Sequence, residues 1–581
     1  MANFYEDNED IQFHLRTLNL GRIAWLQEEG FRDAERCDYA PRDEADATDG
    51  YAYVLKVVGD LAANFIAPRA ESVDREGSAL QEDGSVRYAR GIRESLNALT
   101  RADLMGFTLP RRFGGLNFPN IIYTMAVEII SRADASLMNI FGLQGIAETI
   151  NAFASDELKA EYLPRFASGG VTGAMALTEP DAGSDLQSIR LKAAEADDGW
   201  WKLSGVKRFI TNGCGEVLLV LARSETDREG GLGLSLFLCE RSDRVRVRRL
   251  EDKMGIHGSP TCELYFDEAP ARLIGERQRG LVSYVMPLMN GARIGIAAQS
   301  LGIAQAAFNE ARAYARDRVQ FGTPIDRIPP VAEMLAEMEV AIEAARAVTY
   351  EGSCTVDEQH GLLRQMEWAG DLDDARRREL VVRERFLRRL NSFLTPLAKY
   401  VATEMSIRVT YDAIQVLGGS GFMRDYPLER LARDARITTI YEGTTQLQIV
   451  AAVRGVLSGV VESYLEGLAG QPYPEGTKRL QQELVRAREL LAKAVTYVKE
   501  KGGYDYTELY ARPLVDMAND ILVGYLFLRE ARASERKLAV ARRHVARARP
   551  RLRMNYALVT SGERSTLRDF AQLVPSPVAP E

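Results

Sequence analysis

Apolar residues recur at helical spacing through most of the first third of the chain. Segments such as YAYVLKVVGDLAANFIA place them on one face of a helix, and breaks fall at glycine and proline, as in PRRFGG. The pattern predicts an all-α domain over residues 51–170, preceded by an N-terminal extension over residues 1–50.

The spacing changes to that of strands after Val171. WWKLSGVKRFIT predicts two strands about a turn at Ser204-Gly205, EVLLVLA predicts a buried strand, and CELYF alternates apolar with polar residues. We therefore expect a small β domain over residues 171–275, inserted between helical parts.

Helical spacing resumes after Gly280, and its apolar stripe is typical of an antiparallel bundle, which we expect over residues 276–465. Within it, the charged stretch at 351–390 predicts a solvated helical insertion between two helices. A Gly/Pro-rich linker begins at Gly467, and an additional helical extension is expected over residues 466–581. Its last residues, PSPVAP, are expected to be disordered.

Composition fits a large enzyme of a reducing compartment. The chain has 581 residues, of which 46% are hydrophobic, so it can bury several cores. No apolar run reaches the ~18–20 residues of a membrane span, and the acidic start is unlike a signal peptide, so we expect a cytoplasmic protein. The five cysteines are scattered, and no Cys or His spacing predicts a metal site. The net charge of -8 argues against a general affinity for nucleic acid.

Four spaced segments carry the candidate chemistry. They are ALTEPDAGSD at 176–185, KRFITNG at 207–213, RDRVQFG at 316–322, and QVLGGSGF followed by RDARITTIYEGTTQLQ at 415–448. Backbone amides and hydroxyls can bond the polar edge of a ring, glycine permits close approach, and arginine suits phosphate. No GxGxxG fingerprint of a dinucleotide-binding fold opens a strand-turn-helix unit.

Together these segments resemble the acyl-CoA dehydrogenase family, from about residue 70 to about residue 460. The longer ends, and IHGSPTC at 256–262, are similar to an enlarged branch that includes methylthiopropanoyl-CoA dehydrogenases and mycobacterial long-chain enzymes. The resemblance implies an α+β fold with an N-terminal α-helical domain, a middle β-barrel-like domain and a C-terminal four-helix bundle. The extra C-terminal helical domain would follow these.

The resemblance also implies a reaction. It is the α,β-dehydrogenation of an acyl-CoA thioester to a trans-2-enoyl-CoA in fatty acid β-oxidation, with electrons passed to electron-transferring flavoprotein. Because no side chain accepts hydride, a cofactor is needed, and the family uses FAD. Among acyl groups, we expect a straight-chain fatty acyl group.

The family's cofactor contacts carry over residue by residue. The backbone of Leu177 and Thr178 would lie against the flavin, Phe209 would cover it, and the Thr211 hydroxyl would bond near the ring nitrogen that receives hydride. Ser184 would also touch the thioester tail of the substrate. The implied cofactor-binding set of the subunit is Leu177, Thr178, Gly183, Ser184, Phe209, Ile210, Thr211, Thr444 and Gln446.

A second set of residues resembles those that serve a neighbouring subunit. Arg318 and Phe321 would reach the pyrophosphate and adenine of that subunit's FAD, and Gln415, Gly418 and Gly419 would approach it through backbone groups. A monomer would then have incomplete sites, so the resemblance implies a dimer, with a tetramer also open.

Glu442 matches the family's catalytic base, and Gly443 lies beside the substrate. A carboxylate in an apolar pocket has its pKa raised towards the acidity of an enolising thioester. Some relatives place the base on an earlier helix, but there this chain has Asn290, Gly291, Ala292 and Arg293, with no carboxylate. Arg293 matches a substrate-side arginine.

Two alternative functions stay open. An acyl-CoA oxidase shares the fold and the glutamate but passes electrons to oxygen. A flavin-bearing nucleic-acid-binding relative would use the basic segment 535–553, although this segment has no interleaved aromatic residues and is more typical of an exposed helix face.

Overall fold

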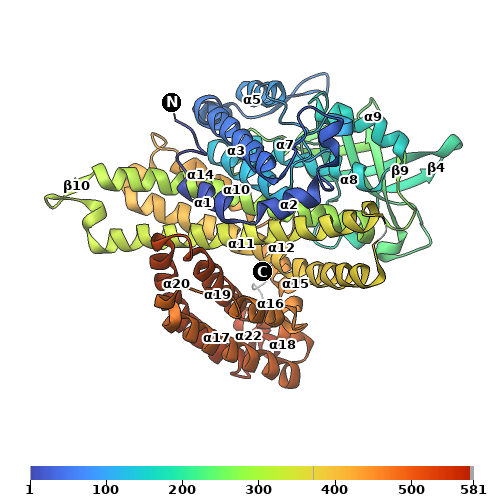
Figure 1. Cartoon of the computed structure of the whole chain (residues 1–581). Helices are drawn as coiled ribbons and strands as arrows, with labels where there is room; N and C mark the ends of the chain where they lie inside the picture. Colours follow the sequence, from blue (N-terminus) through green and yellow to red (C-terminus); the bar gives the residue numbers. More distant parts are fainter. Residues whose placement is uncertain (1, 371, 576–581) are drawn as a thin grey trace. The chain divides into compact units, whose positions relative to one another are not determined.

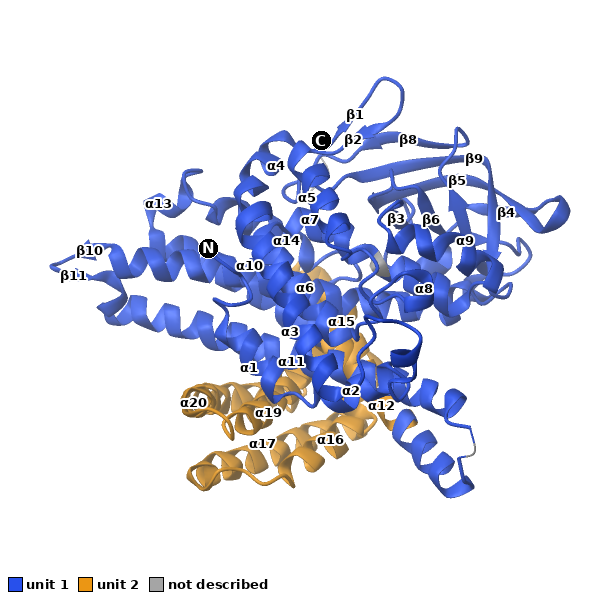
Figure 2. Cartoon of the chain, turned by 45° about the horizontal axis from the view of Figure 1, so that its top comes forward, with its two compact units in different colours: residues 1–384, 398–444 blue, residues 385–397, 445–581 orange. Residues whose placement is uncertain are grey.

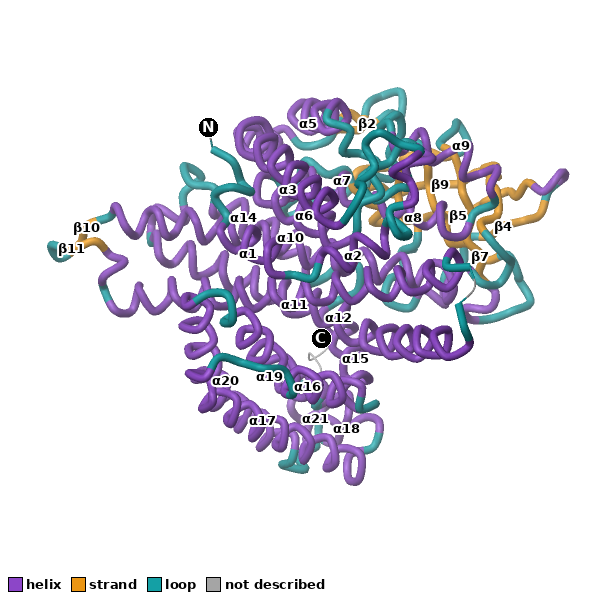
Figure 3. Tube along the Cα trace, viewed as in Figure 1, coloured by secondary structure: helices purple, strands orange, loops and turns teal. Residues whose placement is uncertain are grey.

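The computed structural model describes residues 2–370 and 372–575 and divides into two compact units (Figure 2). The first unit comprises Met1–Glu384 and Ala398–Thr444, and the second comprises Arg385–Leu397 and Thr445–Glu581. Helices dominate both units, and nearly all the strands lie in the middle part of the first unit (Figure 3). The end of the tail predicted to be disordered, 576–580, lies outside the described residues.

The first unit begins with a helical layer. Tyr51 and Leu55 on α3 and Ile122 and Met125 on α6 are buried in one core, as their helical spacing predicts. The helices of this layer are α1 (Glu9–Thr17), α2 (Leu20–Gln27), α3 (Glu44–Leu61), α4 (Ala70–Glu76), α5 (Arg90–Arg101), α6 (Asn120–Ala133), α7 (Ala135–Phe141), α8 (Gly145–Phe153) and α9 (Asp156–Ala167), and its short hairpin is β1 (Ala79–Leu80) with β2 (Val86–Arg87).

The N-terminal extension belongs to the same core. Asn8 caps α1 by accepting hydrogen bonds from the amides of Asp10 and Ile11, both at 3.1 Å. Ile11 is buried beside the helices of the layer. Asp10 lies 2.6 Å from the guanidinium of Arg346, a buried residue of the later helix α11 (Pro329–Trp368). The same guanidinium lies 2.7 Å from the buried Glu128 of α6.

A β barrel follows. Its strands are β3 (Gly173–Ala176), β4 (Lys192–Glu195), β5 (Trp200–Thr211), β6 (Val217–Arg223), β7 (Leu234–Glu240), β8 (Val245–Leu250) and β9 (Thr261–Ile274). The strand order is β3-β6-β4-β5-β9-β7, and an antiparallel pairing of β6 with β7 closes the sheet on itself. The predicted alternation in β9 is confirmed, since Cys262, Leu264 and Phe266 are buried.

The predicted turn at Ser204-Gly205 is wrong. β5 runs without interruption through both residues, and its register against β9 shifts between Leu203 and Gly205. Gly205 has φ +146°, a backbone conformation that glycine adopts without strain. The glycine therefore makes a bulge in one long strand rather than a turn between two.

Long helices complete the first unit. α10 packs against α6 and α11, and a small hairpin joins α10 to α11 at one end (Figure 1). The charged stretch at 351–390 forms the end of α11 and the start of α12, so its predicted helical structure is confirmed. The predicted solvation is wrong for the α11 part, because Glu351, Ser353 and Asp357 are buried in the core. The elements are α10 (Met286–Asp317), β10 (Val319–Gln320), β11 (Thr323–Pro324), α11, α12 (Asp374–Leu417), α13 (Gly419–Phe422) and α14 (Leu428–Thr438). Of α12, Arg385–Leu397 belongs to the second unit.

Helices joined by short loops make up the described residues of the second unit, which include no strand. α19 lies at its centre, almost entirely buried, and packs against α15, α17 and α20. The basic segment 535–553 lies on α20, whose Arg542, Arg549 and Arg553 are exposed while Arg551 pairs with Asp520 at 2.6 Å. The helices are α15 (Thr445–Leu457), α16 (Val460–Ala469), α17 (Lys478–Tyr497), α18 (Tyr504–Leu509), α19 (Ala511–Glu530), α20 (Glu535–Val559), α21 (Ser565–Arg568) and α22 (Phe570–Leu573).

One helical segment among the described residues, Gly280–Asp317, is long and apolar enough to cross a membrane, since an 18-residue window of it has a mean hydropathy of 1.2. The sequence-based expectation of no such run therefore needs correction. The same segment contains α10, whose neighbours α6 and α11 make it a core helix of the first unit, so its composition is weak evidence for a span.

Candidate active site

Glu442 lies in a short loop between the end of α14 at Thr438 and the start of α15 at Thr445. Its backbone is left-handed, with φ +55°, and Gly443 follows with φ +90°. A left-handed residue other than glycine costs roughly 1–2 kcal/mol. The surrounding structure must therefore hold this glutamate in place, which is typical of functional sites.

The electrostatics of Glu442 combine burial with two nearby cations. Burial raises the pKa of its carboxyl group, while the positive charges of Lys399 and Arg293 act in the opposite direction. Arg293 is buried and donates from Nη1 to Oδ1 of Asn290 at 2.8 Å. The helix position where some relatives carry the base thus holds an amide paired with an arginine.

Lys399 is a residue of this site that the sequence analysis missed. Its side chain is fully buried, and Nζ donates to the carbonyl oxygens of Thr438 at 3.0 Å and Gly443 at 2.6 Å. A lysine inside the apolar stretch FLTPLAKYVA of a helix is the signal that could have revealed it.

Tyr441, next to Glu442, is held by a buried amide network. Its hydroxyl donates to Oε1 of Gln299 and lies 3.2 Å from Oδ1 of Asn139. Gln299 in turn donates to Asn139 at 2.8 Å and to the carbonyl of Ala135 at 3.0 Å. Both neighbours of the strained glutamate are therefore fixed by hydrogen bonds from other helices.

The helix that leads into the loop is also anchored. Oδ1 of the buried Asp434 on α14 accepts the amide hydrogen of Ile256 at 2.5 Å, where Ile256 has the unusual φ of +47°. Burial raises the pKa of Asp434 to about 6. Gly255 allows this approach, because an added Cβ would lie 2.6 Å from the backbone carbon of Arg433.

The first predicted flavin segment is fixed by an internal ion pair. Nζ of the fully buried Lys207 lies 2.9 Å from Oε1 of Glu179 and donates to the carbonyl of Leu177 at 2.7 Å. The carbonyl of Thr178 accepts from the amide of Arg208 at 2.9 Å. The backbone around Leu177 is thereby held beside β5, and the sequence analysis did not find the Lys207–Glu179 pair.

Phe209 protrudes from the barrel. The register of β5 against β9 shifts between Lys207 and Ile210, and Phe209 takes φ +61°. Its side chain is 52% exposed, whereas Ile210 is buried in the barrel core, so only the backbone of Ile210 is available to a ligand. Thr211 is partly buried, and Gly183 and Ser184 are exposed in the loop after β3.

The second predicted set lies elsewhere in the first unit. Phe321 is 97% exposed in the hairpin at one end of α10, and Arg318, Gln415, Gly418 and Gly419 are exposed too. Tyr314, one turn before Arg318, donates to Ser420 at 3.4 Å, which places the glycine loop near the hairpin. The barrel with Phe209 lies at the opposite end of α10 in two views (Figures 1 and 2). A single subunit therefore does not bring the two sets together.

The last two predicted cofactor residues flank the boundary between the two units. Thr444 ends the first unit and is partly buried, and Gln446 is an exposed residue of α15 in the second.

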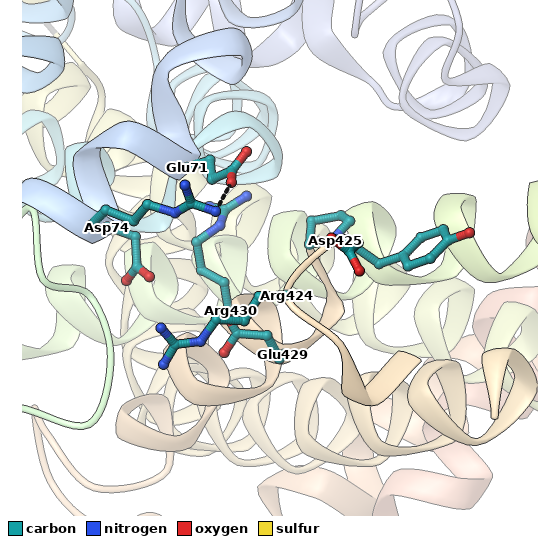
Figure 4. A pocket seen from close by; sticks show the side chains of 9 residues that line it. Glu71, Asp74, Arg424, Asp425, Glu429 and Arg430 are labelled. Atoms are coloured by element: carbon teal, nitrogen blue, oxygen red, sulfur yellow. Dashed lines mark ion pairs between the residues drawn. The ribbon is translucent and has the colours of Figure 1, made fainter. Parts of the chain in front are cut away.

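A charged cavity of about 100 Å³ opens beside the start of α14 (Figure 4). Arg424, Asp425 and Arg430 line it from this side, and Glu71 and Asp74 line it from α4. Arg430 is the last residue of α14 that lines the cavity, and eight residues of helix, about 12 Å at 1.5 Å per residue, separate it from Thr438 at the start of the loop of Glu442. The cavity is thus separate from the candidate active site.

Four family models match consecutive stretches of the chain. They are "Acyl-CoA dehydrogenase, N-terminal domain" at residues 48–170, the middle domain at 174–269, the C-terminal domain at 294–446, and "Acyl-CoA dehydrogenase C terminal" at 458–552. The matches cover most of the chain and include the loop of Glu442.

Individual relatives are similar over long stretches. The chain is 34% identical to an acyl-CoA dehydrogenase of Bacillus subtilis, over 71% of this chain and 99% of the relative. It is 31% identical to a 3-methylmercaptopropionyl-CoA dehydrogenase of Ruegeria pomeroyi, over 84% of this chain and 86% of the relative.

Solved structures are similar as well. One, of the electron transferring flavoprotein of Acidaminococcus fermentans, contains a chain with 31% identity and a TM-score of 0.60, over 70% of this chain and 97% of that one. An acyl-CoA dehydrogenase from Bacillus anthracis, complexed with FAD, has 21% identity and a TM-score of 0.74 over 90% of both chains. Because it covers 90% of this chain, the similarity in fold to the Bacillus anthracis structure includes C-terminal helices of the second unit.

Proposed function

Since this chain belongs to the acyl-CoA dehydrogenase family, we propose that it oxidises an acyl-CoA thioester to a trans-2-enoyl-CoA with Glu442 as the base. Members of the family are oxidoreductases, and the cofactor is FAD. The observation that supports the proposal most strongly is the carboxyl group of Glu442, held in a left-handed loop where burial raises its pKa.

The residues of the first unit fit FAD. Phe209 presents a half-exposed ring on a left-handed backbone, as a residue that covers a flat cofactor would. The loop with Gly183 and Ser184 is open to solvent beside the buried Leu177. When bound, FAD supplies the acceptor for the hydride from the β carbon.

The chain's own residues would remove the α proton and stabilise the negative charge that develops on the thioester. Glu442 accepts it, and burial brings the pKa of the glutamate nearer to that of the thioester α carbon. The backbone amide of Glu442 is proposed to donate to the thioester oxygen, where negative charge develops. Arg293 would favour the charged form of the glutamate before the transfer.

Anaerobic titration of the purified flavoprotein with acyl-CoAs tests the proposal. Bleaching of the flavin by one class of thioester, from propanoyl to palmitoyl or methylthiopropanoyl, would identify the reaction and the substrate together. A flavin that no thioester reduces would contradict it, and salt-dependent DNA binding through α20 would then favour the nucleic-acid-binding alternative.

The proposal also covers the electron acceptor, the cellular setting and the substrate. Electron-transferring flavoprotein is the proposed acceptor, which the similarity to a chain in a structure of such a protein supports. The proposed setting is cytoplasmic fatty acid β-oxidation, with a straight-chain fatty acyl-CoA as substrate. Fast reoxidation of the reduced protein by air would instead favour an acyl-CoA oxidase.

Phe209→Ala is expected to weaken FAD binding about threefold to tenfold, because an aromatic stacking contact contributes roughly 0.5–1.5 kcal/mol. Equilibrium dialysis of FAD measures the effect. Tyr265→Ala, which removes another exposed ring of the same barrel, is the matched control and should leave the affinity unchanged. Equal losses in both variants would argue against Phe209 as the flavin cover.

We further propose a homodimer, because Arg318 directly follows α10 and is exposed together with Gly418, while the barrel lies at the other end of α10 (Figure 1). Arg318→Ala is expected to lower FAD affinity about tenfold or more, since hydrogen bonds to charged groups contribute roughly 1.5–3 kcal/mol. Arg312→Ala on the same helix is the control.

Mixed dimers distinguish whether Arg318 contacts the FAD of the neighbouring subunit or the FAD of its own subunit. A dimer of one Arg318→Ala subunit and one Glu442→Gln subunit keeps one intact site if Arg318 serves the neighbour. At FAD concentrations too low to fill the sites of Arg318→Ala, the mixture is therefore expected to be more active than the two variants measured separately and added together. An inactive mixture would mean that Arg318 acts within its own subunit.

A further inference from the structure

Lys399 is buried at the centre of the candidate active site. It projects from α12, its side chain has no exposed surface, and its ammonium donates to two carbonyl oxygens, those of Thr438 and Gly443. Burying an ammonium group is costly, and here burial lowers the pKa of Lys399 to about 8. Because a neutral side chain would avoid this free-energy cost, we look for a role of Lys399 that requires its charge.

The two carbonyls mark the two ends of one loop. Thr438 is the last residue of α14, where helix carbonyls lack their usual amide partners, and Gly443 directly follows Glu442. One ammonium therefore joins the start of the loop to its end across residues 439–443. Between these two bonds lies Glu442 with φ +55°.

The charge of Lys399 is directed at the same glutamate. Lys399 on α12 and Arg293 on α10 are the two cations that lower the pKa of Glu442, and Lys399 acts more strongly than Arg293. In turn, Glu442 and Glu404 favour the charged form of Lys399, and Arg293 disfavours it. The neighbouring Tyr441 is a phenol whose pKa burial raises, so it adds no charge at neutral pH.

A neutral donor could satisfy two carbonyls without the cost of a buried charge. Lys399 differs from an ordinary helix cap in two respects: it bonds carbonyl oxygens at both ends of the loop, and its positive charge acts on Glu442. We propose that Lys399 is the positioning residue of the catalytic loop, holding Glu442 in its left-handed conformation and stabilising the carboxylate form that accepts the proton. This inference rests on the proposed role of Glu442.

The pH dependence of flavin reduction tests the inference. Glu442 must be deprotonated to act, so the rate rises with pH through the pKa of this group. Removing the positive charge in Lys399→Met should move this acid limb upward by about one pH unit, as loss of a neighbouring opposite charge does. The loosened loop should also lower the maximal rate about tenfold or more.

Lys399→Gln separates the two effects. Its amide can donate to the carbonyls without carrying charge, so the acid limb should move as in Lys399→Met while the maximal rate stays closer to that of the unchanged protein. Lys537→Met, which removes another buried lysine in the second unit, is the control for burial alone and should not move the acid limb.

An acid limb that stays in place in both Lys399 variants would overturn the inference. If Lys399→Met does not fold or does not retain FAD, the acid limb of Lys399→Gln decides alone. Failure of the proposed function would look different, because Glu442→Gln would then still be reduced by acyl-CoA at the normal rate, whatever the result at Lys399.

Discussion

Glu442→Gln is expected to slow reduction of the bound flavin by acyl-CoA about 10³-fold, within the range that a positioned general base contributes. Glutamine has nearly the same shape but cannot accept the α proton. The left-handed loop and its bonds to Lys399 should persist, so FAD content and thermal stability should match those of the unchanged protein. Stopped-flow spectroscopy under anaerobic conditions measures the rate.

Asp357→Asn is the matched control for this variant. Asp357 is also buried, and burial raises its pKa to about 6, but it accepts hydrogen bonds from the amides of Asn120 and Ile121 at the start of α6. Its amide variant should reduce the flavin at nearly the normal rate. If flavin reduction were slow in Asp357→Asn and fast in Glu442→Gln, Glu442 would not be the catalytic base.

Arg346→Met is expected to have the largest effect on stability, about 3–5 kcal/mol, because it leaves the carboxylates of Asp10 and Glu128 buried without their cation. Tyr350, whose hydroxyl donates to Glu128 at 2.7 Å, cannot replace the charge. Because protonation relieves stranded carboxylates, the deficit should shrink as the pH falls. Thermal unfolding at pH 8 and pH 5 compares the two conditions.

Arg408→Met is the control, since Arg408 pairs with Asp412 through a side chain that is 73% exposed. Exposed pairs contribute about 0–1 kcal/mol, so its unfolding temperature should hardly change at either pH. Similar losses in both variants would show that the burial of Arg346 does not matter for stability.

The sequence predicted the fold class and the order of its parts, and the comparisons and the structure confirm both. Periodicity was sufficient for the helices and for β9, because one buried face leaves a regular pattern. It failed at Ser204-Gly205, because a Ser-Gly pair is compatible with both a turn and a bulge, and only the pairing with β9 distinguishes them.

The candidate site was predicted in part, because motifs name residues but not their supports. Glu442 follows from its motif, whereas Lys399 lies 43 residues earlier in the chain and meets its loop only in the fold. Lys207 was read as part of a strand, and its pairing with Glu179 depends on tertiary structure. The assigned contacts to FAD and substrate stay predictions.

α2, which precedes the segment matched by the family models, packs against α11, which lies within that segment. The family model of the N-terminal domain begins at residue 48, yet Trp25 on α2 stacks edge-on against Trp368 at the end of α11, and Leu26 fills the space beside Gly361. A chain trimmed to the shared family segment would uncover both contacts. The match to the family model therefore begins within a core that residues 9–27 help to build.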